Sequence, residues 1–72
     1  MHINNIYIKL GQKIHKLRTE QGITQEHLAS KAGLKRSYIG EIERGTRRVS
    51  IEVLQKLSAA LKVSLADLFK SL

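Results

Sequence analysis

The side chains most able to do chemistry in this sequence are its cations. Thirteen Lys and Arg residues stand against six Asp and Glu residues, so the formal net charge at pH 7 is +7 with histidine neutral. An excess of this size predicts an anionic partner. By charge alone, that partner is nucleic acid, an anionic membrane or an acidic protein.

Residues that could support catalysis or metal binding are not arranged for either. The chain contains no Cys, which excludes disulfides and thiolate ligands. His2, His15 and His27 lack metal-ligand spacing and a partnering carboxylate pattern. No Ser lies in a nucleophile-elbow context, and there is no phosphate-binding loop motif. We therefore expect a protein without enzymatic activity, cofactor or metal.

The length and the apolar runs limit the class of protein further. A chain of 72 residues has the size of one small domain, which we expect to span residues 1–72. No apolar run approaches the roughly 18 residues of a membrane-spanning helix. The N-terminal residues also lack the pattern of a signal peptide. We expect a cytoplasmic protein with no membrane partner.

Five short helices are predicted to position the cations. Aliphatic residues recur at helical spacing, Pro is absent and aromatic residues are few, which favours an all-α, compact five-helix domain. The expected helices cover about 5–21, 25 to the stop at Gly33, 36–44, 51–61 and 64–71. The apolar stripe of the first helix is expected to contain Ile3, Ile6, Leu10, Ile14 and Leu17.

Small polar residues and Gly mark the helix ends. A Ser, Thr or Asn side chain can accept a hydrogen bond from a free amide of the first turn, and Gly readily adopts the left-handed conformation after the last turn. The predicted N-caps are Asn4 or Asn5, Thr24, Ser50 and Ser64, the last with Asp67 in a capping box. The predicted stops are Gly22, Gly33 and Gly45.

The segment 24–45 is expected to form a helix-turn-helix, in which two short helices cross through a tight turn. Ala29 permits the close crossing, and Gly33 suits the turn. Ile39 and Ile42 should anchor the second of these helices on the core. Its outer face would then consist of Arg36, Ser37, Gly40 and Glu41, with Lys35 just before it. Glu43 is expected to pair with Arg47 or Arg48, or with Arg18 on the first helix.

This segment resembles the Cro and phage-repressor type of helix-turn-helix, the XRE-like superfamily with the lambda-repressor-like DNA-binding fold. The matching stretches are LRTEQGITQEHLA, AGLKRSYI, EIERG and VSIEVLQKLSAALKVSLADLF, and the resemblance covers about Gly11 to Phe69. Within that superfamily, the short chain and the motifs RSYI and ERGTRRVS are most similar to the controller proteins of restriction–modification systems.

The resemblance implies that the helix at 36–44 enters the major groove and reads base edges. The base-contacting residues carried over by position are Lys35, Arg36, Ser37 and Glu41. The residues implied to contact the backbone or read groove shape are Gln25, Tyr38, Arg44, Arg47 and Arg48. Arg36 is the strongest reader, because its guanidinium can bond both O6 and N7 of guanine. Glu41 either accepts from cytosine N4 or holds Arg36 in place. Lys35 departs from the family pattern, since it replaces the usual capping residue.

The resemblance also implies a homodimer whose two reading helices lie about 34 Å apart. Its interface would involve Val63, Leu65 and Phe69, on a dimerisation helix at about 64–71. The implied protein is a transcriptional regulator of bacterial or phage origin. It would bind a palindromic double-stranded DNA operator and control restriction–modification genes, its own included. RNA polymerase is a further partner open to it, through Glu26 by analogy.

Two other classes of function share these features. An antitoxin whose main task is to bind a toxin would have the same fold and could also bind its operator. A non-specific or RNA-binding helical module would bind scrambled duplexes with similar affinity. Measured specificity for one DNA sequence would separate the transcriptional regulator from the non-specific or RNA-binding module.

Overall fold

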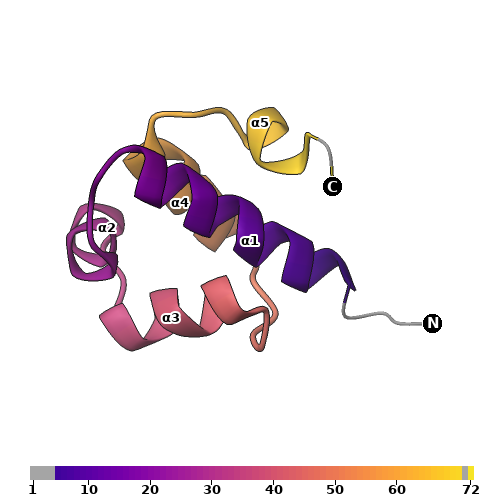
Figure 1. Cartoon of the computed structure of the whole chain (residues 1–72), viewed down its shortest axis with the longest axis horizontal. Coiled ribbons are helices and arrows are strands. Elements are labelled where there is room, and N and C mark those ends of the chain that lie inside the picture. The colour runs from indigo at the N-terminus through magenta and orange to yellow at the C-terminus, as the bar shows by residue number, and fades with distance from the viewer. Residues whose placement is uncertain (1–4, 71) are drawn as a thin grey trace.

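Short connections join five helices in residues 5–70 and 72, the part of the chain that the computed structural model describes (Figure 1). The helices are α1 (Asn5–Glu20), α2 (Gln25–Ala32), α3 (Arg36–Arg44), α4 (Ile51–Leu61) and α5 (Leu65–Phe69). No strand occurs within these residues. The predicted all-α, five-helix fold is confirmed, although α5 ends at Phe69, earlier than expected.

The predicted helix ends are formed by the expected side chains. Thr24 Oγ1 accepts from the His27 amide at 3.0 Å, and Ser50 Oγ accepts from the Val53 amide at 3.1 Å. Ser64 and Asp67 form the reciprocal capping box. Gly22, Gly33 and Gly45 all have φ between 70° and 75°, which is the left-handed region. Ile3 and the cap expected at Asn4 or Asn5 lie outside the described side chains.

One hydrophobic core receives side chains from every helix. Its members are Leu10 and Ile14 of α1, Leu28, Ala29 and Ala32 of α2, Ile39 and Ile42 of α3, Leu54, Leu57, Ala60 and Leu61 of α4, and Leu68 of α5. Ile6 departs from the expected stripe, because the first turn of α1 extends beyond α3 and leaves this side chain exposed (Figure 1). None of the described helices has the length and apolar character that crossing a bilayer requires.

The contact between α1 and α3 depends on a glycine that no sequence motif marks. Gly11 is buried in α1. A Cβ atom at this position would collide with the carbonyl oxygen of Ile42 and lie 2.8 Å from that of Glu43. Both atoms belong to the α3 backbone, which cannot swing aside as a side chain can. The missing side chain therefore lets α3 lie directly against α1.

Candidate nucleic-acid interface

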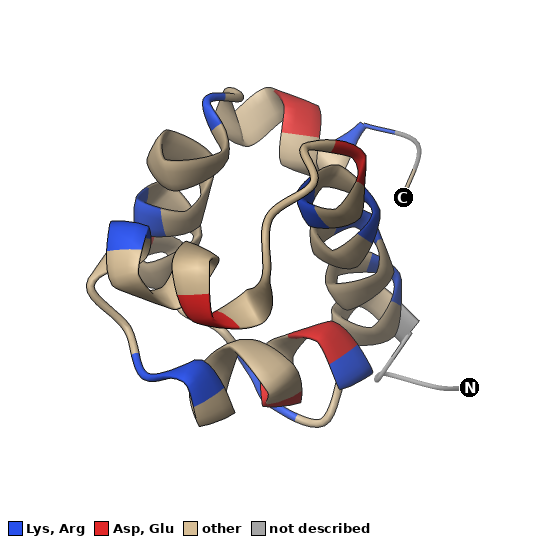
Figure 2. Ribbon diagram, turned by 60° about the vertical axis from the view of Figure 1, so that its left-hand side comes forward, with Lys and Arg blue, Asp and Glu red and all other residues tan. Residues whose placement is uncertain are grey.

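The face of α3 that points away from the core carries the predicted readers. Ile39 and Ile42 are buried on the inner side, whereas Arg36 and Ser37 are exposed. Arg36 forms no ion pair with any other described residue. Basic residues occupy both ends of α3, with acidic residues between them (Figure 2). The structure thus presents an uncompensated guanidinium at the first turn of this helix.

Gly40 was expected on the outer face of α3, and this expectation is wrong. Gly40 is buried, because α2 crosses α3 at this point and the Arg44 side chain folds over it. A Cβ atom at Gly40 would lie 3.2 Å from Arg44 Nη1 and 3.9 Å from Gln25 Oε1. The exposed surface of α3 is therefore narrower than the helical pattern suggested.

A buried carboxylate holds α3 in position. The Glu43 side chain is 5% exposed and accepts from Arg18 Nε at 2.7 Å, from Arg18 Nη2 at 3.2 Å and from Gln25 Nε2 at 3.0 Å. Arg18 also donates through Nη1 to the carbonyl of Ile23 at 2.8 Å. Of the ion-pair partners predicted for Glu43, the one found in the structure is Arg18. These side chains tie α1, α2 and α3 together.

His15 completes this cluster, contrary to the expectation that no carboxylate would partner it. Its Nδ1 lies 2.9 Å from Glu43 Oε1. The sequence pattern could not show this pair, because the two residues are 28 positions apart and meet only where α1 crosses α3. Among the described residues, no group of three or more His, Cys, Asp or Glu side chains could hold a metal ion.

The ionisation of Glu43 reflects a balance between burial and its neighbours. Burial acts to raise the pKa of Glu43, but hydrogen bonds from Arg18, Gln25 and His15, together with the charge of Arg18, outweigh it. The pKa therefore lies below the ordinary value of 4.5. At neutral pH the carboxylate is ionised and keeps its partners. A charged cluster thus fixes the helix that carries the candidate readers.

Gln25 was expected to contact the DNA backbone. One of its amide hydrogens is instead engaged with Glu43. The contact with a phosphate stays a prediction, and it would use the other amide hydrogen or the main-chain N–H at the start of α2. Such amides, at the positive end of a helix dipole, suit an anion.

Five of the predicted contact residues line one surface hollow of about 380 Å³, here called the recognition hollow. Its lining residues are Gly33, Leu34, Lys35, Ser37, Tyr38, Glu41 and Arg47. Arg47 Nη1 lies 3.2 Å from Glu41 Oε1, and the guanidinium lies 4.8 Å from the centroid of the Tyr38 ring. The partner of Glu41 in the structure is therefore Arg47 and not Arg36, which corrects one of the two roles considered for Glu41.

The remaining predicted site residues do not line this hollow. Arg44 is exposed at the end of α3, and Arg48 lies in the connection to α4, beside Tyr7. Of the expected dimer residues, Val63 and Leu65 are half-buried against the chain's own core, whereas Phe69 is 41% exposed. Phe69 is thus the residue of this group with the most surface left for a partner.

The lysine before α3 does not cap the helix, as expected for a side chain that cannot accept a hydrogen bond. Lys35 has the extended backbone of an N-cap residue but makes no side-chain cap hydrogen bond. The first turn of α3 therefore lacks the acceptor that Thr24 and Ser50 supply elsewhere. Lys35 is also exposed on the rim of the recognition hollow, so its ammonium is free to face an anion.

Together, the crossed pair α2 and α3 and the exposed basic first turn of α3 define a DNA-binding helix-turn-helix domain. Residues 14–68 match the family described as Helix-turn-helix, and the chain belongs to this family. The expected membership of the XRE-like group and the resemblance to controller proteins are confirmed by these residues and by the relatives described next.

Several relatives are similar to the chain over most of its length. The control protein C.BamHI of Bacillus amyloliquefaciens is 46% identical over 66 residues, which cover 90% of this chain and 82% of that protein. The control protein C.MunI of a Mycoplasma species is 41% identical over 71 residues, covering 97% and 96%. The crystal structure of the restriction–modification controller protein C.AhdI from Aeromonas hydrophila superimposes with a TM-score of 0.88 at 45% identity, covering 90% of this chain and 98% of that one. These names describe control proteins, not enzymes.

Proposed function

We propose that this protein is a transcriptional regulator that binds a palindromic DNA operator as a homodimer and controls restriction–modification genes, its own included. The observation that carries the proposal is the exposed first turn of α3, where Arg36 has no ion-pair partner among the described residues. The similarity to C.BamHI, C.MunI and C.AhdI supports the controller role. DNA in the bacterial cytoplasm would be the site of action.

Direct readout of base edges is the role proposed for α3. Its first turn would enter the major groove, where Arg36 can bond O6 and N7 of one guanine, worth about 1–3 kcal/mol of discrimination. Lys35 and Ser37 flank Arg36 on the same exposed turn. Glu41 is paired with Arg47 through Oε1, and its other carboxylate oxygen would accept from a cytosine. Tyr38 and Arg47 would then contact the backbone or sense the shape of the groove.

Phosphate contacts would hold this helix in register. Arg44 and Arg48, both exposed, are placed at the end of α3 and in the connection after it. Lys and Arg contacts to phosphates add affinity without sequence preference, and each one steepens the dependence of binding on salt. Gln25, at the start of α2, would add a neutral contact.

A symmetric dimer would supply the second reading helix. Phe69 lies at the end of α5 and remains 41% exposed in the single chain. Leu65 is the first residue of α5, and Val63 lies two positions before it. Burial of these side chains against a second copy would favour association. Phe69→Glu should then give a folded monomer with weak operator binding. Sedimentation equilibrium would test this, and an unchanged dimer would contradict the assigned interface.

The operator can be identified by selection from random sequences. The full chain is incubated with a pool of random duplexes, and the bound duplexes are amplified and sequenced over several rounds. We expect a palindrome whose half-sites are centred about one helical turn apart. Enrichment of no sequence would contradict specific recognition, and enrichment of a single half-site would contradict the dimer.

Contact with RNA polymerase is a separate part of the proposal. Glu26 is exposed in the first turn of α2, on the element next to the reading helix. Glu26→Gln should reduce activation in a purified transcription reaction while operator affinity stays the same. Equal activation by the two proteins would remove Glu26 from this role.

A further inference from the structure

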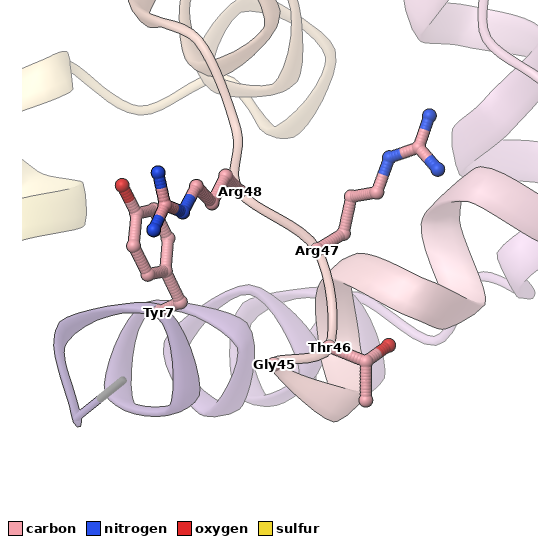
Figure 3. A pocket seen from close by; sticks show the side chains of 5 residues that line it. All are labelled: Tyr7, Gly45, Thr46, Arg47 and Arg48. Atoms are coloured by element: carbon pink, nitrogen blue, oxygen red, sulfur yellow. The ribbon is translucent and has the colours of Figure 1, made fainter. Parts of the chain in front are cut away.

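The connection between α3 and α4 and the first turns of α1 enclose a second hollow, of about 180 Å³, here called the loop hollow (Figure 3). Its lining residues are Tyr7, Gly45, Thr46, Arg47 and Arg48. They supply phenol, hydroxyl and guanidinium groups and no carboxylate. We propose that the loop hollow binds a phosphate of the DNA backbone, with Tyr7 and Arg48 as its donors. This inference rests on the proposed function.

The loop hollow is held in shape by backbone contacts. Gly45 has φ of 75°, and a Cβ atom there would lie 2.7 Å from the Cα of Ile8. The connection therefore lies directly on α1. Thr46 donates to the carbonyl oxygen of Glu41 through both its amide, at 3.1 Å, and its hydroxyl, at 3.2 Å. Because both donors of Thr46 are used, it serves as a wall of the hollow and not as a ligand.

Two neighbouring arginines have different surroundings. Arg47 is turned toward α3, where Glu41 and the Tyr38 ring hold its guanidinium. Arg48 and Tyr7 lie on the same side of the hollow, and Arg47 points away from both (Figure 3). In residues 5–70 and 72, no acidic side chain forms an ion pair with Arg48. The sequence pattern does not distinguish Arg47 from Arg48. Both line the loop hollow, but the Arg47 guanidinium is already paired with Glu41, which makes Arg48 the better donor for a phosphate.

The donors suit a phosphate of duplex DNA. A guanidinium offers a planar pair of N–H groups that match two phosphate oxygens, and a phenol can donate one further hydrogen bond. The loop hollow lies beyond the end of α3, whose nine residues span about 13 Å. Arg36 at one end would read a base while Tyr7 and Arg48 at the other end hold the backbone, which fixes the orientation of the helix.

The first test uses the full chain and the duplex selected as described above. Tyr7→Phe removes one hydroxyl and should weaken binding about 3–10-fold, and Arg48→Gln should weaken it about 10-fold or more. Both losses should be the same on a scrambled duplex, because phosphates carry no sequence. Arg48→Gln should also reduce the slope of log affinity against log salt by about 0.9, whereas Tyr7→Phe should not change it. Lys16→Gln, an exposed change elsewhere on α1, is the control and should leave affinity close to that of the wild type.

The second test locates the phosphate. Methylphosphonate groups, which are uncharged, replace the phosphates of the selected duplex one at a time. At one position in each half-site, the substitution should weaken the wild-type protein but weaken Tyr7→Phe and Arg48→Gln much less. Additive losses at every position would overturn the inference. If the wild type still prefers its operator in that case, the proposed function stands. If the wild type binds the operator and the scrambled duplex equally well, the proposed function itself is contradicted.

Discussion

Arg18 and Arg36 are the same residue type in two regions of this molecule, and their surroundings differ in every respect that matters for function. Arg18 is nearly buried, with a side chain 11% exposed, and is bound to Glu43 and to a main-chain carbonyl. Arg36 is exposed and has no ion-pair partner among the described residues. The first holds three helices together, and the second is available to a partner. A net charge of +7 counts both equally and cannot tell them apart.

The largest expected effect comes from removing the ion pair between Glu43 and Arg18, which tests the structural role of Arg18. Glu43→Ala would leave Arg18 without its counter-charge in a nearly buried site, which should cost about 3–5 kcal/mol of unfolding free energy. Urea unfolding of the two proteins measures the loss. Glu41→Ala is the matched control, since its pair with Arg47 is exposed and should be worth about 1 kcal/mol or less. Similar losses for both variants would contradict the structural role of Glu43.

The next effect tests how closely α3 must lie on α1. Gly11→Ala places a methyl group against backbone atoms of Ile42 and Glu43, so the helices must separate. Overpacking of this kind typically costs about 1–3 kcal/mol. Thermal or urea unfolding would measure it, with Gln12→Ala, an exposed neighbour, as the control. A Gly11→Ala protein as stable as the wild type would show that the crossing can relax.

The dependence of stability on acidic pH provides a further test of Glu43, because its pKa differs between the folded and unfolded states. That pKa is lower in the folded protein than the ordinary value of 4.5. Below about pH 5 the unfolded chain therefore binds more protons than the folded protein, and the unfolding free energy decreases as the pH is lowered. Glu43→Gln removes this proton uptake. The difference in unfolding free energy between wild type and Glu43→Gln should therefore be constant near neutral pH and shrink as the pH falls below 4.5.

Asp67 provides the control for this pH experiment. Backbone and side-chain hydrogen bonds with Ser64 lower the pKa of Asp67 as well, but this residue lies in the capping box of α5 and not in the Glu43 cluster. Asp67→Asn should retain the part of the acid sensitivity that Glu43→Gln loses. A difference between wild type and Glu43→Gln that does not change with pH would contradict the account of Glu43.

The smallest expected effect concerns the start of the reading helix. Lys35→Ser supplies the missing N-cap of α3 and should raise the unfolding free energy by about 1 kcal/mol. If Lys35 meets a phosphate or a guanine, the same change should weaken binding to the selected operator. Increased stability with unchanged affinity would show that Lys35 has no DNA contact.

The parts of this fold that depend on neighbours in sequence were predictable. A helix cap joins residues three positions apart, so Thr24, Ser50 and Ser64 could be assigned from the pattern alone. The periodic apolar residues of α3 likewise indicated which way Arg36 points. These features do not depend on how the helices are arranged in space.

Features that arise where helices cross were not predictable in the same way. The fit of Gly11 against α3, the approach of Gln25 on α2 to Gly40 and the pairing of His15 with Glu43 each join residues whose proximity is set by packing. The different directions of Arg47 and Arg48 were hidden for another reason. They lie in a connection without helical periodicity, where sequence position does not determine the direction of a side chain.

The most direct test of the central claim compares the binding of wild type and Arg36→Ala to the selected operator and to a scrambled duplex of the same length. All four affinities are measured at the same salt concentration. If Arg36 reads a base, the change should cost about 1–3 kcal/mol on the operator and much less on the scrambled duplex, with relaxed preference at one base pair of each half-site. Arg48→Ala, as a control, should weaken both duplexes alike. Equal losses on the two duplexes for Arg36→Ala would contradict the account.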